Sequence, residues 1–365
     1  MKVEIHKKAF LDAFILGGNF ASKSKMLPIL DNVKCLMEEN GTLRFISYDN
    51  ENAISTKMGD VIQFAENISF LLPYKEVVNY VKLIKDEMFM LIVEESQCTI
   101  KHSKGKLNIT LADVTEYPEI VKVNNPITID VDSTDFGYGL SNCNPFISDD
   151  TLRPTTCGVH ICVKDNKLEF CATDSKSLSV IRVGNYEDDY STLDTVINRN
   201  VIPCLLNALK NDNCCTIKVG DANTSFTIGD TIIISRNIIG KYPNYHAVIP
   251  KNNPLQVVLN IKELSESLNR ALLSSSKNLV RLTFSDNKLE ITSEDFDFGK
   301  SSKEELTIDC NFDLEIGVEA KKFIDCASIF DNDEFILSLS DCSHALVFKD
   351  SNDNSISLLM PMILN

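Results

Sequence analysis

The pattern of hydrophobic and polar positions occurs three times along the chain. The segments GTLRFISYDNENAIS, NKLEFCATDSKSLSV and NKLEITSEDFDFGKS each read as a turn, an alternating strand and an acidic turn. Their shared leucines are Leu43, Leu168 and Leu289, which lie 125 and 121 residues apart. Such a regular spacing indicates an internal repeat.

Helical patterns flank each copy in the same register. A strand that leads into a helix precedes each copy, and Phe10, Phe136 and Leu264 hold corresponding positions, 126 and 128 residues apart. A second helix and two or three alternating strands follow each copy. The six predicted helices span 6–16, 74–85, 133–142, 203–210, 261–273 and 319–328.

The order strand, helix, strands, helix, strands predicts the fold class. We expect an α+β protein of three repeated domains, each an antiparallel sheet with two helices on one face. Tyr117 and Tyr242, each followed by proline and 125 residues apart, mark the ends of the first two repeats. The predicted boundaries are 1–124, 125–251 and 252–365.

The composition is that of an ordinary globular protein, with 44% hydrophobic and 24% charged residues. No apolar run is long enough for a membrane span, and the N-terminal MKVEIHKKAF lacks the apolar core of a secretory signal. The twelve cysteines include no CxxC pair, which favours reduced thiols over disulfides or a zinc site. We therefore expect a cytoplasmic protein without membrane contact, metal or cofactor.

The densest group of possible metal ligands is Cys157, His160 and Cys162. If this stretch is a strand, we expect His160 to face away from both thiols, because side chains alternate along a strand. That arrangement argues against metal binding at this group.

Net charge limits the ways in which this chain can bind nucleic acid. It carries 36 Lys and Arg against 52 Asp and Glu, a formal net charge of −16. A protein that binds DNA through its total charge is normally basic. The predicted helices nevertheless carry ten basic and seven acidic residues, so they sum to +3 and the remaining chain to −19. Any nucleic-acid function must therefore rest on where the charge lies.

The chain ends in SISLLMPMILN, with an unbroken apolar run over 358–364. In a half-buried strand apolar residues alternate with polar ones, whereas here both faces are apolar. Pro361 also removes a hydrogen-bond donor, which suits an edge or a chain exit. Two interpretations follow: a buried terminal strand, or one apolar wall of a groove for a partner.

The whole chain resembles the bacterial DNA polymerase III beta subunit family, the sliding clamps. The resemblance is carried by LPILDNV from Leu27, ATDSKSLSV from Ala172, YPNYHAVIPKN from Tyr242 and the terminal LLMPM. It implies a non-catalytic processivity factor, a head-to-tail homodimer of six domains that closes as a ring around double-stranded DNA. It also implies that DNA polymerase, the clamp loader and repair proteins dock a short apolar peptide between the second and third domains.

The resemblance assigns residues to this groove. The implied groove residues are Thr173, Ser175, Lys176, Leu178, Pro243, Val248, Leu358, Met360, Pro361 and Met362. Ser175, Lys176 and Ser177 stand where the family usually has glycine, histidine and arginine, and Ala247 stands where arginine is common. The apolar pocket is thus preserved while its polar rim is altered. We expect the peptide to depend less on its acidic or glutamine positions than is usual in the family.

The resemblance also places basic residues of the helices and of two loops against DNA. These are Lys7, Lys8, Lys23, Lys25, Lys75, Lys82, Lys85, Arg153, Lys210, Lys321 and Lys322. A duplex carries about one charge per 1.7 Å of axis, so a mildly basic bore would centre DNA without holding it tightly. The helix at 133–142 has no basic residue and should contact DNA weakly.

Ring closure is the last feature that the resemblance implies. It brings Leu272 and Leu273 of one subunit to Leu107 and Ile109 of the other. Leu272 and Leu273 end a predicted helix, while Leu107 and Ile109 share one face of a predicted strand.

Two functions of other classes remain open from the sequence. One is a three-repeat scaffold that binds no nucleic acid. The other is a thiol hydrolase that uses Cys342, with His344 two residues away on the same face of a strand. No third catalytic group or oxyanion turn is visible in the sequence.

Overall fold

The computed structural model describes residues 1–365 except 22–26, 60–66, 121, 187–191, 276, 296, 351–353 and 365. The predicted order of elements is confirmed in three consecutive stretches of the chain, each of which begins with a strand and a helix. The α+β class is likewise confirmed, because the sheets are antiparallel and the helices few.

The bounds of the elements show the repeat directly. The first repeat comprises β1 (Lys2–His6), α1 (Lys7–Gly17), β2 (Asn32–Met37), β3 (Leu43–Tyr48), β4 (Asn52–Met58), β5 (Ile68–Pro73), α2 (Tyr74–Leu83), β6 (Met88–Val93), β7 (Gln97–His102) and β8 (Gly105–Thr110). The second comprises β9 (Ile127–Asp132), α3 (Ser133–Cys143), β10 (Gly158–Lys164), β11 (Lys167–Thr173), β12 (Ser177–Val183), β13 (Asp194–Asn198), α4 (Ile202–Ala208), β14 (Cys214–Val219), β15 (Asn223–Ile228) and β16 (Thr231–Arg236). The third comprises β17 (Leu255–Asn260), α5 (Ile261–Leu272), β18 (Leu279–Ser285), β19 (Lys288–Asp295), β20 (Lys300–Thr307), β21 (Leu314–Glu319), α6 (Ala320–Ala327), β22 (Glu334–Leu339), β23 (Leu346–Lys349) and β24 (Ser355–Leu359).

Each repeat contributes two groups of four antiparallel strands. The second to fifth strands join in the order fifth, second, third, fourth, and the first strand joins the last three in the order first, sixth, seventh, eighth. Eight-stranded sheets arise where the fourth strand of one repeat pairs with the eighth strand of the next, as β4 does with β16 and β12 with β24. The equivalent strands β20 and β8 each lie at the edge of a four-stranded sheet.

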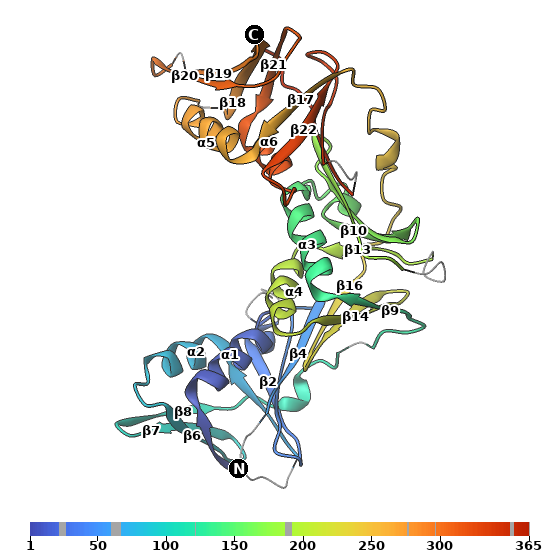
Figure 1. Ribbon diagram of the computed structural model, residues 1–365. Helices are drawn as coiled ribbons and strands as arrows, with labels where there is room; N and C mark the ends of the chain where they lie inside the picture. Colours follow the sequence, from blue (N-terminus) through green and yellow to red (C-terminus); the bar gives the residue numbers. More distant parts are fainter. Residues whose placement is uncertain are drawn as a thin grey trace. The chain divides into compact units, whose positions relative to one another are not determined.

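The chain packs as two compact units, and the second repeat contributes to both. Unit 1 comprises 1–134 and 200–237, and unit 2 comprises 135–199 and 238–365. Each unit holds one eight-stranded and one four-stranded sheet (Figure 1). These units follow the sheets, and the domain boundaries at 124/125 and 251/252 stay predictions from the sequence.

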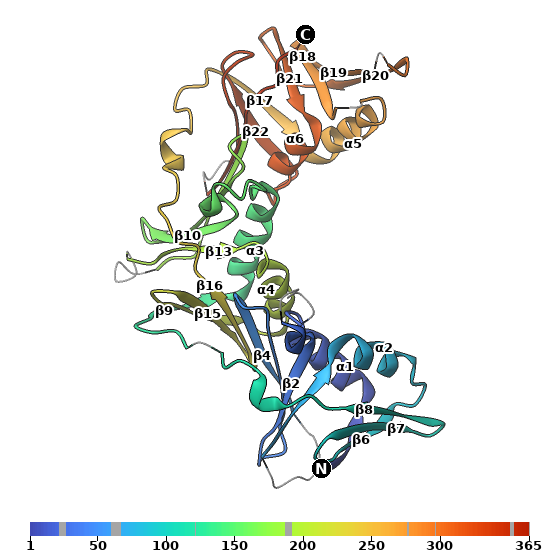
Figure 2. The same cartoon turned by 180° about the vertical axis from the view of Figure 1, so that it is seen from behind.

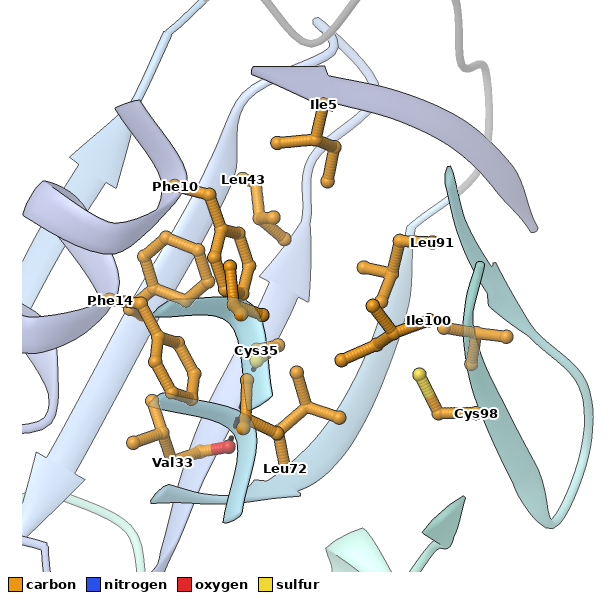
Figure 3. Packing of buried hydrophobic residues seen from close by; sticks show 14 of the residues in the cluster. Ile5, Phe10, Phe14, Val33, Cys35, Leu43, Leu72, Leu91, Cys98 and Ile100 are labelled. Carbon is orange, nitrogen blue, oxygen red and sulfur yellow. Dashed lines mark hydrogen bonds between the residues drawn. The ribbon is translucent and has the colours of Figure 1, made fainter. Parts of the chain in front are cut away.

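The core of unit 1 shows why its first helix forms. Phe10 and Phe14 are four residues apart, so both rings leave one face of α1, and they stack with centroids 5.0 Å apart. Phe45 of β3 and Phe89 of β6 meet Phe10 edge-on at 5.5 and 5.2 Å. Figure 3 shows both rings pointing from α1 toward the strand residues labelled there. Aromatic burial of this kind fixes the helix against the sheet.

Helices lie side by side within each unit in both views. In unit 1 α1 packs beside α2, and in unit 2 α5 packs beside α6 (Figures 1 and 2). Each pair covers strands of its own unit, with α1 against β4 and α5 against β20. None of the helices in the described part of the chain is long and apolar enough to span a membrane.

Candidate peptide-docking groove

The C-terminal tail combines a buried strand with an exposed extension. β24 pairs with β12, where Leu358 lies opposite Leu178, and both side chains are buried. The chain then leaves the sheet: Met360 N–H donates to the Lys176 carbonyl at 2.8 Å, and Met360 is 41% exposed. Ile363 is 86% exposed. The two interpretations of the tail therefore apply to successive parts of it.

Gly317 of β21 receives the extension. Met362 pairs with Gly317 in an isolated antiparallel bridge, and its N–H donates to the Gly317 carbonyl at 2.8 Å. A Cβ at position 317 would lie 2.6 Å from the Met362 carbonyl oxygen and 2.8 Å from a methyl group of Leu364. The absence of a side chain at Gly317 thus lets the tail lie against this strand.

The segment between β16 and β17 supplies the second wall. Tyr242 and Tyr245 are buried in one cluster with Leu178 and Leu358. Val248, just past the 3-10 turn Tyr245–Ala247, is 61% exposed. All ten groove residues assigned from the resemblance belong to unit 2. The buried cluster forms an apolar floor, and exposed apolar side chains continue from both segments that build it.

The turn between β11 and β12 forms a polar rim. The Asp174 carboxylate accepts hydrogen bonds from the backbone N–H groups of Lys176 at 2.9 Å and Ser177 at 2.7 Å. The Thr173 hydroxyl donates to the Ser177 carbonyl at 2.7 Å and accepts from the Ser175 N–H at 3.1 Å. Ser175 adopts φ +75°, a left-handed conformation that glycine adopts more easily than serine.

Lys322 of α6 supports this rim. Its ammonium lies 2.9 Å from Asp174, donates to the Pro145 carbonyl at 2.9 Å and sits over the Phe146 ring. Burial alone would raise the pKa of Asp174, but Lys322 and the turn N–H groups outweigh burial and leave the pKa lowered. Lys322, which the resemblance assigns to DNA, therefore pairs its charge with Asp174 within unit 2.

Arg153, also assigned to DNA, lies at the same rim. Its Nε is 2.9 Å from an Asp150 carboxylate oxygen, and its Nη1 donates to the Ser175 hydroxyl at 3.0 Å. Its side chain remains 60% exposed. Sequence reasoning missed this placement because Arg153 and Ser175 belong to different loops, and no periodic pattern connects them.

A buried carboxylate holds the second wall against the sheet. Glu169 of β11 is fully buried; it accepts from the Tyr245 hydroxyl and from Arg182 Nε, each at 2.6 Å, and lies 2.9 Å from His246 Nε2. Burial opposes ionisation of Glu169, but these hydrogen bonds outweigh it and lower its pKa. This cluster was not predictable from sequence, because a glutamate in an alternating strand normally faces water.

The expectation for His160 was wrong in one respect. His160 and Cys162 are two residues apart in β10, so they share a face, and both approach Tyr245. His160 stacks on Tyr242 with ring centroids 4.6 Å apart and lies 3.1 Å from Asp194. His160 thus packs the segment between β16 and β17 onto the sheet. Within the described residues no group of three or more His, Cys, Asp or Glu is placed to hold a metal ion.

The remaining basic residues assigned to DNA differ in their exposure and in their hydrogen bonds. Lys7 donates to the carbonyls of Lys82 and Ile84 and so closes the end of α2. Lys23 and Lys25 lie outside the described residues. The exposed members of the set are Lys8, Lys75, Lys82, Lys85, Lys210 and Lys321.

The residues assigned to ring closure lie on β8 of unit 1 and at the end of α5 of unit 2. Leu107 on β8 is half-buried and Ile109 is buried. At the end of α5 Leu272 is half-buried, whereas Leu273 is 79% exposed.

The predicted strand face shared by Cys342 and His344 is wrong. Both lie in a turn between β22 and β23, because the Asp341 carboxylate accepts from the N–H groups of Ser343 and His344. His344 Nδ1 also lies 2.7 Å from Asp341, and this contact, together with the hydrogen bonds from Ser343, lowers the pKa of Asp341. The arrangement closes a turn.

Family models match nearly the entire chain. They describe the N-terminal, central and C-terminal domains of the DNA polymerase III beta subunit, and they match residues 1–121, 141–244 and 246–363. Curated relatives named beta sliding clamp, from Staphylococcus epidermidis and Staphylococcus aureus, are 24% and 25% identical over 92% of both chains.

Solved structures agree with this fold over the full length of both chains. The sliding clamp of Pseudomonas aeruginosa bound to griselimycin has a TM-score of 0.92 at 20% identity, and that of Bacillus subtilis has 0.91 at 21%. The fold is therefore that of a three-domain clamp. The chain belongs to the DNA polymerase III beta subunit family.

The function of this chain is that of a DNA sliding clamp, which tethers DNA polymerase and has no catalysis of its own. The comparisons do not support the three-repeat scaffold or the thiol hydrolase.

Proposed function

We propose that two copies of this clamp close head to tail into a six-domain ring around double-stranded DNA. The observation that carries this proposal is the pair of edge strands β8 and β20. They are the eighth and fourth strands of their repeats, and the same two positions pair antiparallel at both junctions within the chain. An unpaired edge offers a row of free N–H and C=O groups to another strand.

The internal junctions predict the register of the third. Ile233 of β16 lies opposite Ile54, and Ser357 of β24 lies opposite Ser179. Ile233 and Ser357 hold the position in their repeats that Leu107 holds in the first, and Ile54 and Ser179 hold the position that Ser302 holds in the third. The same register would therefore place Leu107 of one copy opposite Ser302 of the other. Ile233 and Ser357 are fully buried, whereas Leu107 is half-buried in the single chain. Pairing of β8 with β20 would bury Leu107 in the same way.

Charge favours the same pairing. The hairpin at 97–110 carries three lysines and no acidic residue, while the hairpin at 288–307 carries six acidic residues and three lysines. The two edges therefore have net charges of +3 and −3. Opposite patches steer association and fix its orientation, which supports head-to-tail over head-to-head contact.

DNA would be held by enclosure and by the exposed lysines of the helices. A chain of net charge −16 gains little from long-range attraction to phosphate. A closed ring needs only weak, sequence-independent contacts, for which the exposed Lys8, Lys75, Lys82, Lys85, Lys210 and Lys321 are available. We place this activity in the cytoplasm, where bacterial replication takes place.

The groove of unit 2 would receive short apolar peptides of DNA polymerase, the clamp loader and repair proteins. Its support is the buried floor of Leu178, Leu358 and Tyr242, beside which Val248 and Met360 remain exposed. Exposed apolar side chains continuous with a buried cluster are typical of interaction sites. Methionine adapts its shape to several sequences, which suits a site with several partners.

Retention on DNA tests the ring. The protein is loaded by the clamp loader onto nicked circular DNA, and the complex is passed through a sizing column before and after linearisation of the DNA. We expect retention on the circle and loss after a cut, because a ring slides off a free end. Equal retention on both templates would contradict enclosure, and a single-chain mass at micromolar concentration would contradict the dimer.

A further inference from the structure

The rim of the groove contains a contact between two loops. The Ser175 hydroxyl accepts from Arg153 Nη1 at 3.0 Å, while Asp150 binds the Nε of the same guanidinium at 2.9 Å. Arg153 is thus fixed on two sides although its side chain is 60% exposed. An exposed arginine that is held in place retains less rotamer freedom to lose when it binds a ligand.

Ser175 occupies a backbone position that a serine does not favour. Its φ of +75° lies in the left-handed region. The equivalent turn of the first repeat places Asn50 at φ +80°, and asparagine tolerates this region better than serine. A serine here therefore carries backbone strain, and the hydrogen bond to Arg153 is the interaction that its hydroxyl makes.

The tethered guanidinium has unused donors. Arginine has five N–H donors, and the contacts with Asp150 and Ser175 use one each. Among the residues that the structure describes, no further partner of the Arg153 side chain is present. Lys176 is exposed on the same turn, while Asp174 is neutralised by Lys322. The rim is therefore locally positive on a chain of net charge −16.

We infer that Ser175 is a specificity-determining residue, which holds Arg153 at the rim so that its guanidinium binds an acidic side chain of the docked peptide. The inference rests on the proposed groove and names the chemistry of its ligand: an apolar-anchored peptide that also carries a carboxylate. A guanidinium binds a carboxylate with charge-assisted, often paired hydrogen bonds. The weaker acidic dependence expected from the sequence is replaced by a dependence that runs through Ser175.

The test compares two peptides on four proteins. One fluorescent peptide carries two leucine anchors and an aspartate beside them, and the other carries asparagine in place of the aspartate. The proteins are wild type, Ser175→Gly, Arg153→Gln and Asn50→Gly, and Lys176 is present in all of them. Affinity is measured by anisotropy at low salt, and Tm by thermal melting.

The wild type should prefer the aspartate peptide by about three- to tenfold, the range for a partly exposed charged hydrogen bond. Ser175→Gly should reduce this preference below about twofold and raise Tm, because glycine relieves the backbone strain. Arg153→Gln should also abolish the preference. Asn50→Gly makes the same backbone change in the other turn, and it should leave both affinities unchanged.

In Ser175→Gly the preference for the aspartate peptide should fall while Tm rises. A purely structural role of Ser175 would instead lower Tm and both affinities together. A preference that survives Ser175→Gly, or a wild type that binds both peptides equally, overturns the inference while the groove itself stands. If neither peptide binds the wild type, the proposed groove fails, and the inference fails with it.

Discussion

The two strand junctions within the chain share a backbone and differ in chemistry. At the first, Ala53 of β4 lies opposite Ile234 of β16; at the second, the equivalent Leu178 lies opposite Leu358. Each junction follows a turn in which an aspartate, Asp49 or Asp174, accepts two backbone N–H groups.

The two junctions differ in the polarity of the side chains around them. The first junction borders a hollow of about 250 Å³, whose lining includes the charged Glu51 and Arg236 and two asparagines besides apolar residues. Arg236 is equivalent in position to Met360, which is apolar and exposed at the second junction. The fold thus builds the same junction repeatedly, and side chains at a few positions make the second copy more apolar than the first.

Two linkers join consecutive repeats, the first between β8 and β9 and the second between β16 and β17, and they are also held differently. Glu169 and Arg44 both follow the shared leucine of their repeats, but Glu169 is fully buried beneath Tyr245, whereas Arg44 pairs with Glu38 near the surface. The first linker is tied more simply, by the Tyr117 hydroxyl at 3.4 Å from the Asn32 carbonyl. The linker beside the groove therefore depends on a charge buried in the sheet.

Loss of the buried Glu169 carboxylate should destabilise the protein far more than loss of its counterpart Arg44. Glu169→Ala leaves Arg182, Tyr245 and His246 without their shared acceptor, and removing one partner of a buried charge network costs about 3–5 kcal/mol. Arg44→Ala at the equivalent site should cost less, because Arg44 and Glu38 both keep partial contact with water. Denaturant unfolding of the two variants measures both changes, and equal losses would remove the distinction.

The third junction, between copies, should respond to a change at Leu273. Leu273→Asp places a charge on a side chain that is 79% exposed in one chain, so the monomer should melt normally. Burial of a leucine contributes about 1.5–3 kcal/mol per interface, so dimerisation should weaken by at least tenfold. Sedimentation at several concentrations measures this change, with Leu83→Asp, which alters another exposed leucine, as the control. A Leu273→Asp dimer of wild-type affinity would refute the assignment.

Removal of Met362–Asn365 tests whether the tail past β24 forms one wall of the proposed groove or belongs to the hydrophobic core. The cut removes the bridge to Gly317 but leaves Leu358 and Leu359 in their sheet. Stability should fall by about 1 kcal/mol, the value of one hydrogen bond, while peptide binding is lost. A thermal melt and a titration with a leucine-anchored peptide decide the matter, and a melt that collapses would mean that the extension is structural.

Acid should weaken unit 2 through Glu169 and Asp174. The pKa of each is lowered in the folded state, so their stabilisation is present above the unfolded pKa, about 4, and is lost as pH falls through the lowered values. Tm should therefore drop below about pH 4. Asp174→Asn should flatten this dependence, and an unchanged pH profile would show that the network does not titrate.

Periodicity predicted the elements well because each depends on local sequence. Phe10 and Phe14 fix one helix face, and the alternation after Leu43, Leu168 and Leu289 fixes three strands. Pairing of β4 with β16 was not predictable in this way, because it joins residues far apart in the chain.

The site was predictable only in its apolar part. Leu178 and Leu358 belong to recognisable segments, whereas the roles of Arg153, Lys322 and Glu169 come from contacts with other loops or strands. The resemblance assigned both Arg153 and Lys322 to DNA. The fold brings Ser175 beside Arg153 and Asp174 beside Lys322, and sequence patterns carry no information about such contacts.

In the proposed ring, β8 of one copy pairs with β20 of another in the register of the internal junctions. That register places Asn108 opposite Ser301, as Ile234 lies opposite Ala53 and Leu358 opposite Leu178. Directly opposed residues of antiparallel strands have Cα atoms about 4.5–5.5 Å apart, within disulfide range. The most direct measurement is oxidation of the Asn108→Cys, Ser301→Cys double variant on nicked circular DNA. We expect a covalent dimer that stays on the circle in detergent and leaves after linearisation, while Asn108→Cys with Lys303→Cys, shifted by two residues, crosslinks poorly. Equal crosslinking of the shifted pair, or no dimer beyond that of the oxidised wild type, would contradict the account.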